Sequence, residues 1–234
     1  LSGRPSVSIY EGHITVTHAA NNTMPFEEQK ANFISLCQTL GVKAILIELQ
    51  SGAPKNGNFQ FQTSQWYNRP FSDVRNLMTE TSKQFMTNHW IIERQKIEAT
   101  PCLRIGSENC PIEDEDVKNF PLTNYFEFHA KISVPCTQDQ VETDQMNLMI
   151  KDLCAKHQAH LSRNAFKKFD KNEHRFLTLR LYGIGQKTAF AKFDALLDAL
   201  KDQMIEVVGT QREYAVWDTN VNHDAGWIDS GDHQ

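Results

Sequence analysis

The chain has 234 residues, of which 40% are hydrophobic and 23% are charged. This balance is ordinary for a globular protein with a real core, and the length suits one large domain or two small ones. The net charge of −5 argues against a nucleic acid as a large-surface partner and against an anionic membrane surface, because both need clustered Lys and Arg.

No apolar run approaches the roughly 18 residues of a transmembrane helix, so no membrane partner is expected. The first residues, LSGRPSVSIYEG, lack the apolar core of a signal peptide and begin without Met, so an export signal could have been trimmed. The five cysteines lack Cys-x-x-Cys spacing, which favours free buried thiols and a cytoplasmic location. They are Cys37, Cys102, Cys110, Cys136 and Cys154. Whether Cys102 and Cys110 pair is left open.

The sequence repeats itself once. IYEGHITVT (9–17) and YFEFHAKIS (125–133) share an aromatic-Glu-x-His core and alternate like strands. A helical pattern follows each and passes through Leu-Cys, with His13 and Cys37 separated by 24 residues and His129 and Cys154 by 25. The two halves therefore begin alike.

The later elements recur in the same order. Strands are predicted at 42–49 and 159–166, and at 58–66 and 174–182; then come helices at 71–89 and 187–203, and strands at 90–100 and 205–216. Each copy reads β-α-β-β-α-β, which is the ferredoxin-like order. The predicted fold class is α+β: a tandem duplication of a ferredoxin-like unit, with two antiparallel sheets and helices on their outer faces. The alternative is one large two-lobed domain whose repeat has no functional meaning.

This pattern also sets the expected domain boundaries. The first lobe covers 1–101 and the second covers 123–218. An acidic segment with two prolines, at 102–122, reads as the linker, and a polar tail follows at 219–234.

Period-two alternation places polar side chains on the face of each sheet that the helices leave open. Such a face is commonly just solvated; the interpretation favoured here is that the two open faces line an inter-lobe cleft. The residues assigned to it from the first copy are Glu11, His13, Thr15 and Gln65, the last in phase with Phe61 and Thr63. From the second copy they are Glu127, His129, Lys131, Thr178, Arg180, Gln211 and Glu213. His160 and Arg163 belong either to a basic rim of the cleft or to a strand end that is merely solvated.

These residue types suit acid–base chemistry on an anion. His13 and His129 are predicted as general acid and base, with Glu11 and Glu127 fixing their tautomers. Lys131 and Arg180 would hold a phosphate. The remaining residues assigned to substrate binding are Thr15, Thr178, Gln65, Gln211, Glu213, His160 and Arg163. The alternative is a surface ion-pair ladder of little energetic weight.

Neither a metal nor a cofactor is predicted. His157 and His160 have metal-ligand spacing, but they straddle the end of a predicted helix and the next strand, with no further ligand nearby.

HITV (13–16) resembles the His-x-Thr-hydrophobic motif of the two-histidine phosphoesterases. The resemblance implies a duplicated two-lobed α/β protein that cleaves or cyclises phosphodiesters without a metal. The second copy reads HAKI, so Lys131 stands where Ser or Thr is expected, and HLSR (160–163) fits better but lies elsewhere in the repeat.

EFHAK (127–131) is also similar to the Glu-x-Glu-x-Lys strand of the triphosphate tunnel enzymes. Here His129 replaces a Glu of that pattern, and the other acidic strands are missing.

The predicted function is an enzyme acting on a phosphorylated or nucleotide-like substrate in the cleft, by metal-independent phosphodiester cleavage with paired histidines. One alternative is a non-catalytic module that binds a small anion or a partner chain. Another is an interaction protein that uses its sheet edges or the acidic linker. The oligomeric state is not predicted.

Overall fold

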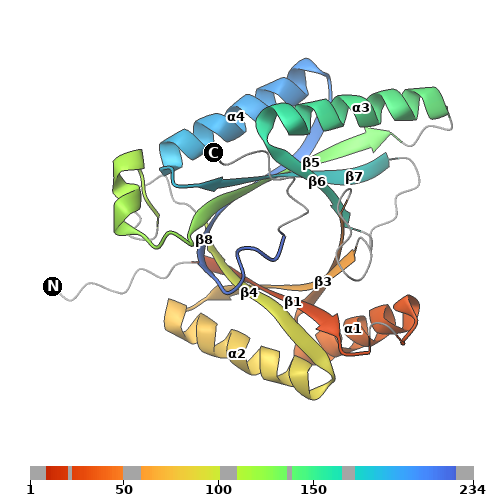
Figure 1. Ribbon diagram of the computed structural model, residues 1–234, viewed down its shortest axis with the longest axis vertical. Helices are drawn as coiled ribbons and strands as arrows, with labels where there is room; N and C mark the ends of the chain where they lie inside the picture. Colours follow the sequence, from red (N-terminus) through yellow and green to blue (C-terminus); the bar gives the residue numbers. More distant parts are fainter. Residues whose placement is uncertain are drawn as a thin grey trace. The chain divides into compact units, whose positions relative to one another are not determined.

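The computed structural model describes residues 9–20, 23–49, 59–100, 110–135, 139–164 and 172–224. The chain divides into two compact units (Figure 1). Unit 1 comprises 1–47, 52–100 and 215–234, and unit 2 comprises 48–51 and 101–214.

Unit 1 contains the first set of helices and strands. They are β1 (Ile9–His18), α1 (Phe26–Leu40), most of β2 (Lys43–Leu49), β3 (Phe59–Asn68), α2 (Phe71–Thr87) and β4 (Trp90–Ala99). Helix α1 ends at Gly41, whose φ of 68° is the left-handed conformation that glycine adopts readily. Both helices cover one face of β1, β3 and β4 (Figure 1).

Aromatic side chains fill the space between these helices and strands. The Phe33 ring lies 5.1 Å from Phe61 and 5.5 Å from Trp90. Gly12 on β1 allows α2 to approach closely, because a Cβ there would lie 2.8 Å from both the Met78 sulfur and the Tyr67 ring. The spacing of apolar residues in both helices thus fixes which sheet face they cover.

Unit 2 contains the second set. Its elements are the 3-10 helix η1 (Asp114–Asn119), β5 (Tyr125–Pro135), α3 (Gln140–His157), β6 (Ala159–Asn164), β7 (Asn172–Tyr182), α4 (Gln186–Asp202) and β8 (Glu206–Asp218) up to Tyr214. Asp139 caps α3 by accepting from the Val141 amide at 2.8 Å. The Phe128 ring packs 5.2 Å from Phe193 of α4, and both side chains are fully buried.

The described part of the predicted linker packs onto the start of α4. The Asp114 carboxylate accepts from the Gly185 amide at 2.7 Å, and the Gln186 amide donates to the Pro111 carbonyl at 2.9 Å. A Cβ at Gly185 would lie 2.3 Å from the Glu113 backbone, so only glycine permits this approach.

The predicted fold class is wrong. The helices and strands occur in the predicted order, but the strands are hydrogen-bonded in the order β1-β3-β2-β6-β7-β5-β8-β4, which closes on itself as a barrel. In two separate ferredoxin-like sheets, β2, β4, β6 and β8 would be edge strands. Closure pairs these edges and so removes unpaired backbone groups, and this long-range pairing leaves no trace in local periodicity.

Cross-strand register shows which side chains share a face. In unit 2, Glu127 lies opposite Arg180 and His129 opposite Thr178, in agreement with the alternation of the sequence. In unit 1, Gly12 lies opposite Gln65. Gln65 therefore shares the helix-covered face of Gly12, and its assignment to the polar face is wrong by one residue.

Two further features concern the helices and the thiols. None of the described helices is long and apolar enough to cross a membrane. Cys37 and Cys154 are free and buried, and Cys110 is buried too, whereas Cys102 and Cys136 lie outside the described residues.

Candidate functional site

The polar face of unit 1 holds a histidine between two carboxylates. This first cluster consists of Glu11, His13 and Glu98. Register places Glu11 directly opposite Glu98 on β1 and β4. The Nε2 atom of His13 lies 3.0 Å from Glu98 Oε2 and 3.8 Å from Glu11 Oε1, while Nδ1 lies 3.0 Å from the Thr63 carbonyl oxygen. That carbonyl can only accept, so this contact needs a proton on Nδ1, whereas a bond from the Gln62 Nε2 amide to the same atom needs Nδ1 without one.

Other polar groups enclose the first cluster. Ser64 Oγ donates to Glu11 at 2.5 Å, and Lys96 Nζ lies 2.9 Å from Glu98. Gln62 Nε2 lies 3.1 Å from His13 Nδ1, and the Gln62 Oε1 atom accepts from the Thr15 hydroxyl at 3.4 Å. The His13 side chain is only 9% exposed. The first cluster is a closed network of buried polar groups.

Unit 2 contains the corresponding second cluster, which consists of Glu127, His129 and Glu213. The Nε2 atom of His129 lies 3.5 Å from Glu127 and 3.6 Å from Glu213, which are ion-pair distances. On the other side of the ring, Nδ1 lies 2.9 Å from the Thr178 hydroxyl.

Each carboxylate of the second cluster has a partner that fixes it. Arg180 Nε donates to Glu127 at 2.5 Å, and both side chains are at most 5% exposed. Gln211 Nε2 donates to Glu213 at 2.6 Å. The imidazole itself is 23% exposed, whereas the two glutamates are 4% and 3% exposed.

The two clusters therefore share an architecture but differ in access. In each, a Glu-x-His strand lies beside the last strand of its copy, which supplies the second Glu. His13 is enclosed by hydrogen-bonding groups, whereas almost a quarter of the His129 side chain is exposed. Among the described residues, no group of three or more His, Cys, Asp or Glu side chains is arranged to hold a metal ion.

The structure brings some of the other predicted residues to these clusters. His160 lies opposite Thr178 across β6 and β7, so His160, Thr178 and His129 form one row on three strands. Lys131 lies opposite Phe176, one step along this face.

Arg163 does not belong to this row. It lies opposite Arg175, which bonds to Asn147 of α3 and so marks the helix-covered face. Its guanidinium binds Glu48 at 2.6 and 2.8 Å and Glu173 at 3.0 Å. The side chain is 49% exposed, and its predicted place beside the polar row is wrong.

Sequence reasoning missed Glu98 of the first cluster and the polar residues near it on β3 and β4. The missed residues are Gln62, Ser64, Arg94, Lys96 and Glu98. Their signal was present, because Arg94, Lys96 and Glu98 alternate with apolar or neutral residues along β4. On β3, Phe61 packs against Phe33 of the core and so sets the phase that places Gln62 and Ser64 on the polar face.

Comparisons with known proteins do not assign a family. No family model matches the chain, and no curated protein matches it. Solved structures that resemble it include two mutants of chlorite dismutase from Candidatus Nitrospira defluvii, each 10% identical, with TM-scores of 0.29 and 0.30. The first comparison covers 88% of this chain and 90% of the chlorite dismutase chain. The second covers 95% of this chain and 94% of the chlorite dismutase chain. A haem-binding protein from Thermus thermophilus is 10% identical over 89% of this chain and 90% of its own, with a TM-score of 0.28.

The predicted phosphorylated substrate and phosphodiester cleavage are wrong. In this chain each histidine lies beside two carboxylates, which would repel a phosphate, and the neighbouring cations Lys96 and Arg180 already bind Glu98 and Glu127. The same repulsion rules out the phosphorylated anion that was predicted as the partner.

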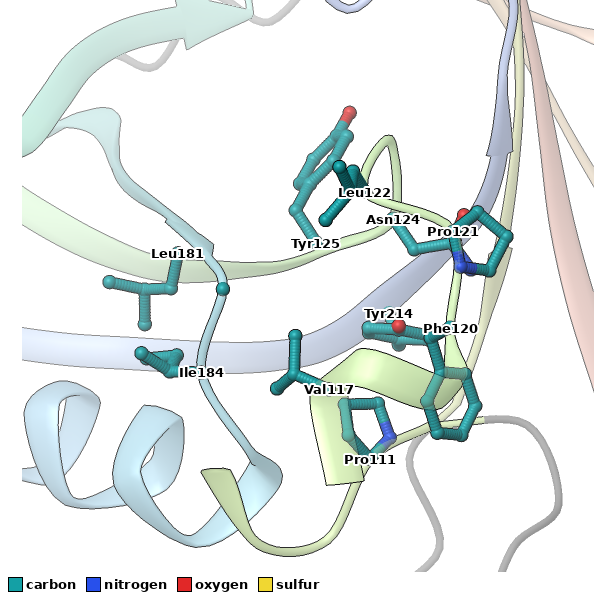
Figure 2. Close-up of a pocket in the computed structure, with 11 residues that line it drawn as sticks. Pro111, Val117, Phe120, Pro121, Leu122, Asn124, Tyr125, Leu181, Ile184 and Tyr214 are labelled. Atoms are coloured by element: carbon teal, nitrogen blue, oxygen red, sulfur yellow. The ribbon is translucent and has the colours of Figure 1, made fainter. Parts of the chain in front are cut away.

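A pocket in unit 2 allows the fit of haem to be tested. Figure 2 shows this pocket between η1, the start of β5 and β8, with Phe120, Tyr125 and Tyr214 among its lining residues. Its cavity of about 20 Å³ has room for roughly one water, whereas sites for cofactor-sized ligands take about 300–1,000 Å³.

The lining also lacks a suitable iron ligand. It contains no His, Cys or Met, which leaves tyrosine as the possible axial ligand. Burial raises the pKa of Tyr214 to about 12, although a hydrogen bond with Asn124 opposes this, so the phenolate that iron needs is disfavoured. The described pocket does not fit haem.

Proposed function

We propose that unit 2 carries an acid–base site in which His129 transfers a proton to or from a small molecule that is not an anion. The observation that carries this proposal is the second cluster itself: an imidazole that is 23% exposed, with Thr178 at Nδ1 and two buried carboxylates on the Nε2 side. Histidine suits this role because its ordinary pKa lies near neutral pH.

The groups around the His129 imidazole have different roles. Thr178 fixes the orientation of the ring through Nδ1. Glu127 and Glu213 stabilise the imidazolium that forms when Nε2 takes a proton. Arg180 and Gln211 keep these carboxylates in place, so a carboxylate need not reorganise during proton transfer.

The charge and composition of the row narrow the substrate class. Two carboxylates beside the imidazole disfavour phosphates and carboxylates as ligands. His160 lies opposite Thr178 on the neighbouring strand and offers a hydrogen-bonding group. Phe176 lies two residues from Thr178 along β7 and offers an aromatic surface. An uncharged molecule with a polar group and a planar apolar part suits these neighbours best.

A charge-sorted fragment screen in D₂O tests the proposal. Neutral, cationic and anionic fragments are added to the wild type, to His129→Gln and to a control variant, His89→Gln, which changes an exposed histidine of unit 1. Thermal stability and deuterium uptake at the carbon atoms of each fragment are measured. We expect neutral fragments to stabilise the wild type by about 2.7 kcal/mol at roughly 100 times Kd. Deuterium uptake at carbon should disappear in His129→Gln and persist in His89→Gln.

Two outcomes of this screen count against the proposal. One is stabilisation by anions alone. The other is equal deuterium uptake in the wild type and His129→Gln. Haemin is included as a separate probe, and we expect no shifted Soret band, because the described pocket is too small for a porphyrin.

We also propose a cytoplasmic location. Its support is that Cys37 and Cys154 are free and buried, as thiols in a reducing compartment commonly are. Fractionation of cells that express the tagged chain, with an exported marker protein as control, tests it; recovery in the exported fraction would contradict the proposal.

A further inference from the structure

One buried arginine holds the C-terminal segment Asp218–Asp224 onto unit 1. Arg94 Nε and Nη2 donate to the two carboxylate oxygens of Asp218 at 2.9 and 2.5 Å, and Nη1 donates to Asp224 at 2.8 Å. The Arg94 side chain is 5% exposed, and those of Asp218 and Asp224 are 0% and 2% exposed. A planar guanidinium can bind two carboxylates in this way because it presents five donors in a fixed arrangement.

Asp224 lies on the same polar face as the first cluster. Its second carboxylate oxygen accepts from Gln60 Nε2 on β3 at 3.1 Å. Arg94 is paired with Thr15 across β4 and β1, and Thr15 is two residues from His13 on that face. The end of the described chain thus lies on the side of β1 and β4 away from α2 (Figure 1).

The contacts described for the rest of the segment are polar. The Thr219 amide donates to the Gln95 carbonyl at 3.0 Å, and the Gln95 amide donates back to the Thr219 hydroxyl at 2.8 Å. Asn220 Nδ2 donates to the Glu93 carbonyl at 3.1 Å. Within 219–224 only Asp224 is buried. Segments with few buried apolar side chains open more readily than the core to which they attach.

We propose that Asp218–Asp224 is a releasable strap, whose Asp224 carboxylate occupies a carboxylate-binding site built by Arg94 and Gln60. Release of the strap exposes the polar face of unit 1 beside His13 to solvent. A free carboxylate then takes the place of Asp224. This inference does not depend on the proton transfer proposed for His129, because it concerns only residues of unit 1.

Chemical rescue tests the strap. Asp224→Ala deletes the bound carboxylate, and Asp194→Ala is the matched control, because Asp194 pairs with Arg212 in unit 2 and is 56% exposed. Thermal unfolding is followed in sodium formate and in sodium chloride at equal ionic strength. Histidine modification by diethyl pyrocarbonate is measured by mass spectrometry, with His129 as internal reference.

We expect Asp224→Ala to raise the modification rate of His13 on the order of tenfold, as local opening of the strap predicts. The rate at His129 should stay unchanged. Formate should restore both the melting temperature and the protection of His13, whereas chloride should not, and Asp194→Ala should behave like the wild type.

Three results would overturn the inference. His13 could stay protected in Asp224→Ala, formate could act no better than chloride, or His13 and His129 could become equally reactive. Asp224→Asn, which keeps the size of the side chain, serves if the alanine variant does not fold. If neither variant folds cooperatively, the segment is part of the core of unit 1 and is not a strap.

Discussion

Arg180→Gln should be among the most destabilising single changes at the second cluster. The side chains of Arg180 and Glu127 are 5% and 4% exposed, and the guanidinium donates to the carboxylate at 2.5 Å. The substitution leaves Glu127 buried without its guanidinium partner. It also removes a cation–π contact, since the guanidinium carbon lies 5.6 Å from the centre of the Tyr125 ring.

The expected cost follows from burial. Removing one partner of a buried ion pair costs about 3–5 kcal/mol, which corresponds to a drop in melting temperature of roughly 6–20 °C for a chain of this size. Arg163 provides the comparison, because its guanidinium also binds a glutamate, in this case through two nitrogens, but the side chain is 49% exposed. Arg163→Gln should cost less than about 1 kcal/mol.

Urea unfolding measures both variants and the double variant Glu127→Gln/Arg180→Gln. Because the double variant removes both charges, it should recover most of the loss, with the midpoint shifting at an unchanged slope. The reasoning is refuted if Arg180→Gln destabilises no more than Arg163→Gln. It is also refuted if the double variant is less stable than Arg180→Gln alone.

Three further changes have defined outcomes. Gly185→Ala should lower the free energy of unfolding by about 2–4 kcal/mol, because the added Cβ displaces the linker backbone and its hydrogen bonds to α4. Gly209→Ala is the control, because nothing lies within 4 Å of its added Cβ, and it should change that free energy by less than about 1 kcal/mol. Thermal unfolding measures both variants, and equal melting temperatures would contradict this prediction. Burial, together with the nearby His89, lowers the pKa of His18. The unfolded chain therefore binds a proton more readily than the folded chain, and the free energy of unfolding should fall as pH drops below about 6.5. Urea midpoints measured over a pH series test this, and an equally steep fall of the midpoint in His18→Gln would contradict it. Burial raises the pKa of Cys37 to about 12, so its thiol should react with iodoacetamide at pH 8 only when the protein unfolds. The prediction is contradicted if Cys37 of the native protein is labelled at the rate of a free thiol.

Local pattern determined much of each half of the chain. The period-two alternation of β5 placed Glu127 and His129 on one face, and register confirms that Arg180 and Thr178 lie opposite them. The apolar stripes and the stop at Gly41 likewise gave the helices their positions. These properties follow from the strand and helix repeats of the backbone, which a run of ten or twenty residues already expresses.

Tertiary structure alone decided which strand edges pair, which phase β3 takes, and what surrounds each histidine. Edge pairing and register depend on hydrogen bonds between residues far apart in sequence, so comparison of the two copies put Gln65 one residue out of phase. The second carboxylates, Glu98 and Glu213, come from strands more than 80 residues away from their histidines. Glu213 was predicted on the polar face as a substrate-binding residue, whereas Glu98 was not predicted there. Because each of these glutamates lies beside an imidazole, the predicted phosphate site is instead two imidazoles flanked by carboxylates.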